Sequence, residues 1–152
     1  MKTVNPAYIE ELKKVVKKSP YPRHMSMVLD HIEIDRADIV IHLADYHLQP
    51  YGIVHGGVIA TLIDTATFWA AFLRIPDPDG LVNIDLKLNY LQPVIDGRLT
   101  ARGTCLWPGN TISYSEAKVF DDNGKLIAHG TSTLMLLKGK GLKLGVGKFL
   151  ED

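Results

Sequence analysis

Residues 58–73 read VIATLIDTATFWAAFL. At about 3.6 residues per turn, the apolar side chains of this stretch fall on every side of a helix, and only three threonines and one aspartate interrupt them. A helix that is apolar all round is buried all round. In a chain of 152 residues, either a sheet wrapped around the helix or a partner subunit must provide that cover. The stretch therefore predicts a buried central helix.

Asp64 is the single charged residue of this stretch. Aspartate is a poor helix former in mid-helix, and burying a carboxylate without partners is unfavourable. One interpretation is structural: the hydroxyls of Thr61, Thr65 or Thr67 hold the carboxylate, which then has no chemical role. The interpretation that we favour is that the carboxylate faces a cleft and acts as a base or a nucleophile.

The residues before the helix are rich in glycine. Gly52 is followed by His55-Gly56-Gly57, and adjacent glycines let the backbone approach a ligand closely. The N–H groups at a helix start lack partners within the helix and lie at the positive end of its dipole, so they can hold an anion or an oxyanion. We therefore expect Gly56 and Gly57 to contact a ligand.

The spacing of Gly56 and Asp64 bears on the number of subunits. The two residues are eight positions apart, which is about 12 Å along a helix axis. One carbonyl group cannot contact both residues of the same helix. If both act on one substrate, a second copy of the helix must lie antiparallel, with Gly56 of one chain facing Asp64 of the other. The sequence thus predicts at least a dimer with composite sites.

The remainder of the chain predicts one further helix and about six strands. Asn5-Pro6 is a good helix start, and apolar residues at helical spacing follow until Ser19-Pro20. Two-residue alternation between turn signals then indicates strands. The strand-like runs are residues 28–34, 39–43, 81–91, 98–107, 111–120 and 125–137. This order predicts a single α+β domain over residues 1–152, with a helix within residues 1–20 and an irregular tail at residues 138–152.

The composition argues against several classes of protein. Seventeen Lys and Arg balance seventeen Asp and Glu, so the charge favours neither nucleic acid nor an anionic membrane. No apolar run approaches the roughly eighteen residues of a membrane span, and the N-terminus lacks a signal-peptide pattern. The single cysteine, Cys105, fits a reducing compartment. We expect a cytoplasmic protein with neither nucleic acid nor a membrane as a partner.

Residues 49–64 combine four features at fixed spacing. They read QPYGIVHGGVIATLID: an amide side chain, a glycine three residues on, HGG, and an acid eight residues after the first glycine of that pair. This pattern resembles the hotdog-fold thioesterases, in particular the PaaI-like (phenylacetic acid degradation) group, and the resemblance extends through Leu137. In that fold a bent antiparallel sheet wraps a long central helix, and two subunits join their sheets edge to edge. The resemblance implies an acyl-CoA hydrolase that forms a dimer and a dimer of dimers.

The resemblance also implies a role for individual residues. Asp64 becomes the general base or nucleophile and the Gly56 N–H the oxyanion donor, with His55 shaping the turn. Gln49 takes the position of an amide that orients the water or the thioester carbonyl, where many members have Asn. Asn83 lies where relatives often have Ser or Thr beside the water, and an amide can also hydrogen-bond water. Both amides fit equally well as ordinary polar residues of a loop and a strand end.

Thioester hydrolysis makes modest demands on a protein. It needs an attacking water or carboxylate and a donor for the oxyanion, and coenzyme A leaves readily. Phe68 and Phe72 follow Asp64 by one and two helical turns, so they either line an acyl pocket or belong to the core. The six histidines show no metal-ligand spacing, so we expect no metal and no cofactor, with coenzyme A only as part of the substrate. Two alternatives stay open: a hotdog hydratase or dehydratase acting on acyl-CoA or acyl carrier protein, and a non-catalytic acyl-CoA-binding protein.

Overall fold

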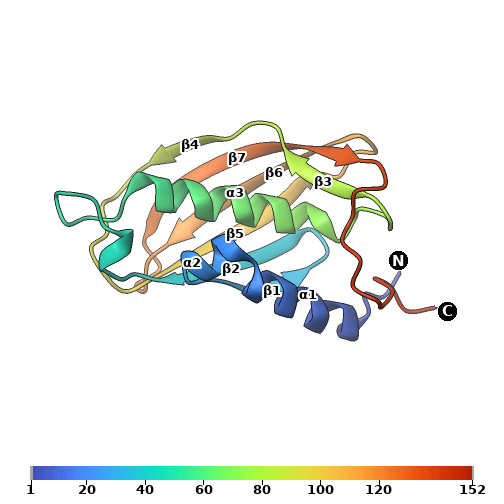
Figure 1. Ribbon diagram of the computed structural model, residues 1–152. Coiled ribbons are helices and arrows are strands. Elements are labelled where there is room, and N and C mark those ends of the chain that lie inside the picture. The colour runs from blue at the N-terminus through green and yellow to red at the C-terminus, as the bar shows by residue number, and fades with distance from the viewer. Residues whose placement is uncertain (1, 152) are drawn as a thin grey trace.

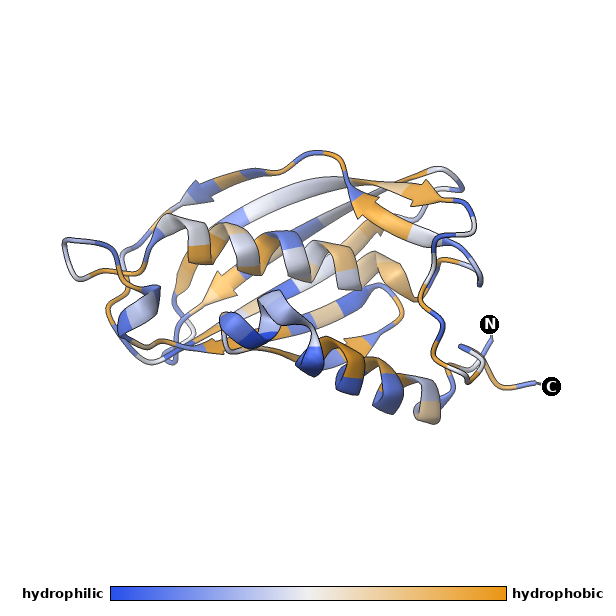
Figure 2. Cartoon of the chain, viewed as in Figure 1, coloured by the Kyte–Doolittle hydropathy of each residue, from blue (hydrophilic) through white to orange (hydrophobic). Residues whose placement is uncertain are grey.

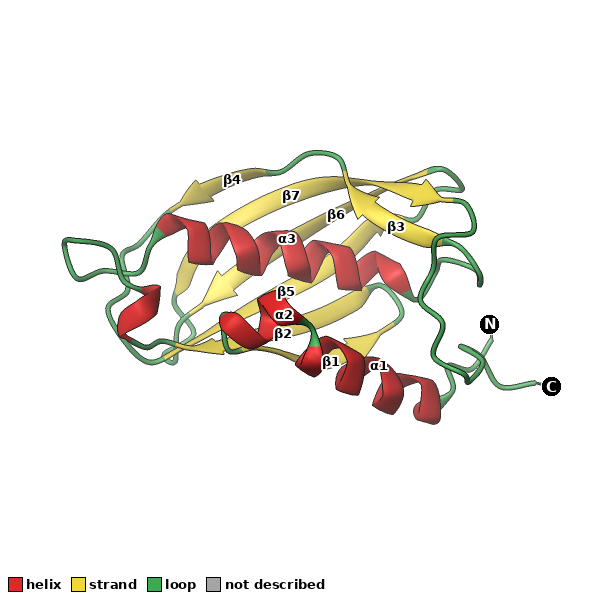
Figure 3. Cartoon of the chain, in the orientation of Figure 1, coloured by secondary structure: helices red, strands yellow, loops and turns green. Residues whose placement is uncertain are grey.

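The computed structural model describes residues 2–151, in which one antiparallel sheet curls around a long helix (Figure 1 and Figure 3). The helices are α1 (Pro6–Lys18), α2 (Pro20–His24) and α3 (Gly56–Phe72), and residues Asp45–His47 form a 3-10 turn. The strands are β1 (Met27–Glu33), β2 (Arg36–His42), β3 (Gly80–Asn83), β4 (Lys87–Tyr90), β5 (Arg98–Trp107), β6 (Ile112–Phe120) and β7 (Leu126–Leu137). No helix within residues 2–151 is long and apolar enough to cross a membrane.

The sheet has two different edges. Its strands follow the order β1-β2-β5-β6-β7-β3, and β4 pairs with β7 as well. Every pair of neighbouring strands is antiparallel. Strand β1 forms one edge, while the short strands β3 and β4 follow one another along the other. This arrangement confirms the predicted α+β hotdog fold, with seven strands where about six were expected.

Helix α3 lies against the concave face of the sheet (Figure 1). Its residues Leu62 and Ile63 are fully buried there. The close approach depends on Gly103 of β5, because a Cβ at that position would lie 2.1 Å from the carbonyl oxygen of Ala66. The sheet does not bury the helix on every side, however. Its partly or fully exposed residues follow the helical spacing and form an open stripe, composed of Gly56, Gly57, Ala60, Thr61, Asp64, Thr65 and Phe68.

The N-terminal helix is amphipathic, as predicted, with alternating polar and apolar positions visible in Figure 2. Its apolar side chains Tyr8, Leu12 and Val16 are buried. Helix α1 ends at Lys18, but Pro20 begins the short helix α2, because proline suits a first helical position. The C-terminal stretch contains no helix or named strand up to residue 151, yet it packs against the start of the chain through a bridge between residues 4 and 149.

The predicted strand at residues 81–91 is interrupted in the structure. It forms β3 and β4, with residues 84–86 between them. There the Asp85 carboxylate accepts hydrogen bonds from the Thr133 N–H at 2.6 Å and from the Thr133 hydroxyl at 3.1 Å. A side chain thus replaces a backbone partner of β7. Two-residue alternation in the sequence cannot predict that a side chain takes the place of a backbone partner on a distant strand. The prediction of a single continuous strand was therefore wrong.

Candidate active site

The start of α3 is organised by the residue that precedes it. The His55 Nδ1 accepts a hydrogen bond from the Gly57 N–H at 2.7 Å, and the His55 carbonyl accepts one from the Val58 N–H at 2.9 Å. His55 is itself fixed, because its N–H donates to the His47 carbonyl at 2.8 Å. The Gly56 N–H has no acceptor among residues 2–151. It is therefore a donor left available at the positive end of the helix dipole.

Asp64 lies half-buried on the open stripe. Its carboxylate forms no hydrogen bond or ion pair with any residue from 2 to 151, and burial raises the pKa of this carboxyl above its ordinary value. The Thr67 hydroxyl donates to the carbonyls of Ile63 and Asp64 at 2.8 and 2.9 Å. The Thr61 hydroxyl pairs with that of Tyr21 at 2.5 Å. The structural interpretation, in which threonine hydroxyls hold the carboxylate, therefore finds no support within the described chain.

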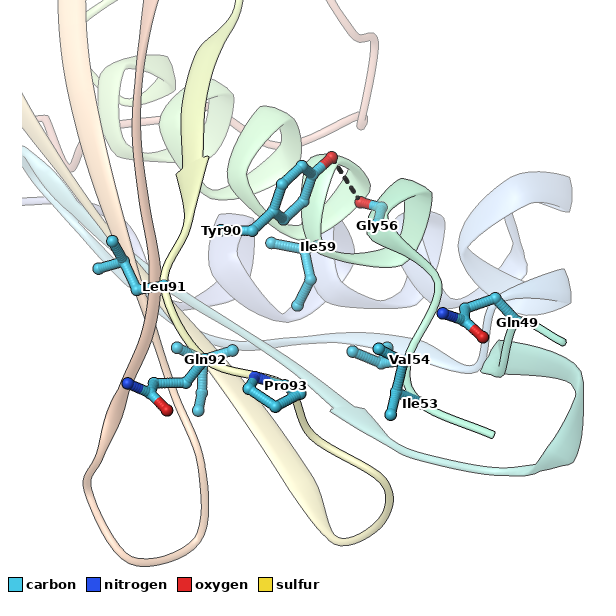
Figure 4. A pocket seen from close by; sticks show the side chains of 10 residues that line it. Gln49, Ile53, Val54, Gly56, Ile59, Tyr90, Leu91, Gln92 and Pro93 are labelled. Carbon is cyan, nitrogen blue, oxygen red and sulfur yellow. Dashed lines mark hydrogen bonds between the residues drawn. The ribbon is translucent and has the colours of Figure 1, made fainter. Parts of the chain in front are cut away.

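A pocket of about 340 Å³ opens beside the start of α3 (Figure 4). It is lined by Gln49, Ile53, Val54, Gly56, Ile59, Tyr90, Leu91, Gln92, Pro93 and Ile127. Asp64 does not line this pocket, which agrees with the axial separation of about 12 Å between Gly56 and Asp64. The pocket of one chain thus contains the candidate oxyanion donor without the candidate base.

Gln49 lies where the sequence placed it, on the loop that precedes α3. Its side-chain oxygen accepts a hydrogen bond from the Tyr51 N–H, which fixes the amide across a tight turn. The Gly52 N–H donates to the Gln49 carbonyl at 2.8 Å, and Gly52 has a φ of 78°, which glycine adopts without strain. The amide nitrogen of Gln49 donates to no acceptor within residues 2–151 and can face a ligand in the pocket.

Asn83 holds the edge strand to the helix. Its Nδ2 lies 2.8 Å from the Ser132 hydroxyl, 3.2 Å from the Asp64 carbonyl and 3.3 Å from the Thr67 hydroxyl. The amide is therefore next to the backbone of Asp64 and engaged with three acceptors. These contacts give Asn83 a clear structural role, and its assignment to a catalytic water stays a prediction.

Phe68 and Phe72 lie at the other end of α3 from the pocket. Their rings stack with centroids 5.8 Å apart, and Phe72 is only 2% exposed. Neither residue lines the pocket beside Gly56. Phe72 thus belongs to the core within one chain, whereas Phe68 reaches the open stripe.

Tyr90 is a site residue that the sequence did not indicate. Its hydroxyl donates to the Gly56 carbonyl at 3.2 Å, as Figure 4 shows. A Cβ at Gly56 would lie 3.0 Å from the Tyr90 ring, so the ring packs directly on this glycine. The two residues are 34 positions apart, and no local pattern links them.

Three known proteins resemble this chain in sequence or in structure. The 1,4-dihydroxy-2-naphthoyl-CoA hydrolase of Escherichia coli is 24% identical over 110 residues, 71% of this chain and 79% of that protein. The crystal structure of a thioesterase from Haemophilus influenzae is similar with a TM-score of 0.81 and 25% identity, covering 90% of this chain and 95% of that one. The E. coli PaaI protein of the phenylacetic acid degradation operon has the same fold, with a TM-score of 0.80 at 16% identity over 88% of this chain and 96% of that one.

The match to the family as a whole covers the segment that contains the candidate site. The profile of the thioesterase superfamily matches residues 51–128, about half of the chain. This range includes the HGG turn, α3 with Asp64, and the strands that form the pocket. The chain belongs to the thioesterase superfamily.

Proposed function

We propose that this protein hydrolyses acyl-CoA thioesters of aromatic or short- to medium-chain acids. The proposal rests on two polar groups of α3 that have no hydrogen-bond partner in the described chain. The Asp64 carboxylate is half-buried and has no partner within residues 2–151, and the Gly56 N–H at the helix start has no acceptor there. A base or nucleophile and an oxyanion donor are the two groups that the reaction requires.

The chemistry follows from these two groups. Asp64 removes a proton from a water molecule, whose oxygen bonds to the thioester carbon while the carbonyl oxygen becomes negative. The Gly56 N–H and the helix dipole stabilise that oxyanion. The intermediate then expels the thiolate of coenzyme A, which takes up the proton, and the carboxylic acid is released. In the alternative route, Asp64 attacks the carbon itself and water hydrolyses the resulting anhydride. Both routes proceed without a metal or a further cofactor.

Both routes need two subunits. Because Gly56 and Asp64 are about 12 Å apart along one helix, the site combines Gly56 of one subunit with Asp64 of an antiparallel partner. The open stripe of α3 leaves Asp64 and its neighbours uncovered, and β3 and β4 form a sheet edge that can pair with another chain. We infer a homodimer joined at this edge, with a dimer of dimers as the larger assembly.

The name of one relative supports a coenzyme A ester as the substrate, since the E. coli protein is a 1,4-dihydroxy-2-naphthoyl-CoA hydrolase. Cys105 is buried and free, which supports a reducing, cytoplasmic location.

A thiol-release assay with a panel of acyl-CoAs tests the proposal. We expect free thiol and free acid to appear in equal amounts for aromatic or medium-chain esters. A hydratase or dehydratase would instead change the absorbance of enoyl or hydroxyacyl substrates without releasing thiol. A binding protein would take up acyl-CoA without turnover, and either result would contradict the proposal.

A further inference from the structure

The pocket beside Gly56 is formed by three segments that are distant in the sequence. The first segment, the loop before α3 and the first turn of the helix, supplies Ile53, Val54 and Ile59. The other two segments, residues 90–93 and Ile127 of β7, supply the opposite wall. Val54, Ile59 and Ile127 are at most 7% exposed, so the floor of the pocket is fixed by the core. Figure 4 shows the side chains of Ile53, Val54 and Ile59 around one hollow, with Tyr90 above it.

The lining indicates what kind of group can enter. None of its ten residues carries a charge, and its polar groups are the amides of Gln49 and Gln92 and the hydroxyl of Tyr90. Phosphate groups are held by cations or by clustered N–H groups, whereas apolar walls favour uncharged groups. The nucleotide end of coenzyme A does not suit this pocket, and the acyl group does.

The position of the pocket also indicates that it holds the acyl group. If the thioester oxygen is held at the Gly56 N–H, the acyl group begins one bond away, at the carbonyl carbon. Ile59 follows Gly56 by three residues, so the two are neighbours on the surface of α3, and both line the pocket. The acyl group is therefore the part of the substrate that reaches the floor at Ile59 and Ile127.

The volume limits the length of the acyl group. At roughly 30 Å³ for a water-sized group, a pocket of about 340 Å³ holds about ten heavy atoms. A phenylacetyl or octanoyl group fits within this space, and a palmitoyl group does not.

We propose that this pocket is the acyl-binding subsite, that it accepts uncharged aromatic or medium-chain acyl groups of about ten heavy atoms, and that its floor at Ile127 sets the upper limit. This inference rests on the proposed thioester hydrolysis. Phe68 and Phe72 of the same chain lie toward the other end of α3 and do not line this pocket.

The test compares acyl-CoAs of two to sixteen carbons and phenylacetyl-CoA across four variants. Ile127→Ala deepens the floor, and Leu134→Ala is its control, since it truncates another buried residue of β7 outside the pocket. Ile53→Trp narrows the wall at a partly exposed position, and Ile95→Trp adds the same ring at an exposed position outside the pocket.

We expect kcat/KM of the wild type to fall at least tenfold beyond about ten acyl carbons. Ile127→Ala should shift this limit by about two carbons, because each methylene in an apolar pocket changes kcat/KM by about tenfold or more. Ile53→Trp should lower kcat/KM for octanoyl-CoA at least tenfold and for acetyl-CoA less than twofold. A length profile that is the same in pocket variants and controls would overturn the inference.

Binding of S-(2-oxoalkyl)-CoA ketones, which cannot be hydrolysed, separates this inference from the proposed function. Calorimetry with these probes should reproduce the same length limit and the same shifts in Kd. If the wild type binds them with this limit but releases no thiol from acyl-CoAs, the hydrolase proposal fails and the subsite stands. If thiol release is normal while neither pocket variant changes the Kd of these probes, the subsite proposal is wrong and the hydrolase proposal stands.

Discussion

At the scale of single residues, the Asp64 carboxylate is the unusual group of this protein. It lies half-buried on a helix whose other residues are almost all apolar, and no residue from 2 to 151 hydrogen-bonds to it. Carboxylates in such surroundings are normally paired. An unpaired one is destabilising at neutral pH, and a role in catalysis gives a reason for its presence.

Asp64→Asn keeps the shape of the side chain and removes its charge and basicity. We expect kcat to fall at least about 100-fold, because a positioned proton-transfer group contributes at least that factor, while KM changes little. The melting temperature should hold or rise, since a neutral amide loses less on burial than a carboxylate. Kinetics and thermal unfolding on one preparation check both effects. A variant that melts earlier but turns over at the wild-type rate would refute a catalytic Asp64.

The raised pKa of Asp64 gives a prediction for pH dependence. Hydrolysis requires the ionised carboxylate, so the acidic limb of kcat/KM should lie above the range of an ordinary aspartate. A carboxyl whose pKa is raised on folding favours the folded state at low pH, and this contribution is lost as pH rises through the folded-state pKa. Asp64→Asn should therefore be more stable than the wild type at neutral pH, with the difference vanishing at low pH. Denaturant unfolding across pH measures this, and an equal difference at every pH would contradict the assignment.

Tyr90 contacts the candidate site at Gly56. Tyr90→Phe removes the hydrogen bond to the Gly56 carbonyl and keeps the ring that packs on this glycine. We expect kcat to fall a few-fold, because one hydrogen bond of about 1 kcal/mol no longer orients the peptide that follows the proposed oxyanion donor. The acyl-length profile should stay unchanged, since the ring still bounds the pocket. A changed profile with unchanged kcat would mean that the hydroxyl contacts the acyl group instead.

At the scale of elements, the close packing of α3 against the sheet depends on small residues in the strands behind it. Gly103 faces the Ala66 carbonyl, and Gly130 of β7 faces Ile63, where a Cβ would lie 2.8 Å from its methyl carbon. These glycines let the helix approach the sheet closely enough to bury Leu62 and Ile63. The position of Gly56 and Asp64 over the sheet therefore depends on strand residues far from both.

Gly103→Ala tests this dependence. The added Cβ would lie 2.1 Å from backbone, which cannot move as a flexible side chain can, so the helix must shift. We expect a loss of about 1–3 kcal/mol in the free energy of unfolding, as for other overpacked cores, and reduced activity. Gly147→Ala is the control, because its Cβ would have an ordinary contact at 3.6 Å. Equal stability of the two variants, measured by urea unfolding, would show that the helix is not seated as described.

At the scale of the whole molecule, one chain leaves two features incomplete. The open stripe of α3 is not covered by the sheet, and the edge at β3 and β4 has no neighbouring strand within residues 2–151. Each feature lies close to Asp64, since Asn83 of β3 contacts its carbonyl. A dimer that completes both would also bring a partner's Gly56 toward Asp64.

Complementation between two inactive chains tests this assembly. Gly56→Pro removes the proposed donor N–H at a position where proline fits the helix, and Asp64→Ala removes the proposed base. In a mixed dimer, one site carries both defects and the other carries neither, so activity should partly return. Gly56→Ala is the control for the added Cβ, because it retains the N–H. Absence of recovery in proven heterodimers, or an active monomer in sedimentation, would contradict the composite site.

Local physical rules predicted most of the elements and singled out the two groups on α3. The apolar run and the HGG turn predicted a helix at residues 58–73, and α3 spans Gly56–Phe72. Helical and two-residue periodicities predicted the sheet and the N-terminal helix because each depends only on neighbours in the sequence. The roles of Gln49, His55, Gly56, Asn83 and Asp64 stay predictions.

Only the tertiary structure determined what surrounds those groups. Three contacts join segments that are distant in the sequence. Tyr90 contacts Gly56, Asp85 accepts hydrogen bonds from Thr133 at the break between β3 and β4, and Asn83 contacts α3. The pocket likewise combines three such segments, and Phe72 is buried in the core at the other end of the helix. The sequence by itself determined most of the elements and which two groups on α3 are chemically unusual, because capping, periodicity and an isolated charge are local properties. Folding decided where the pocket lies and which side chains line it, because a cavity exists only where packed segments fail to fill the space between them.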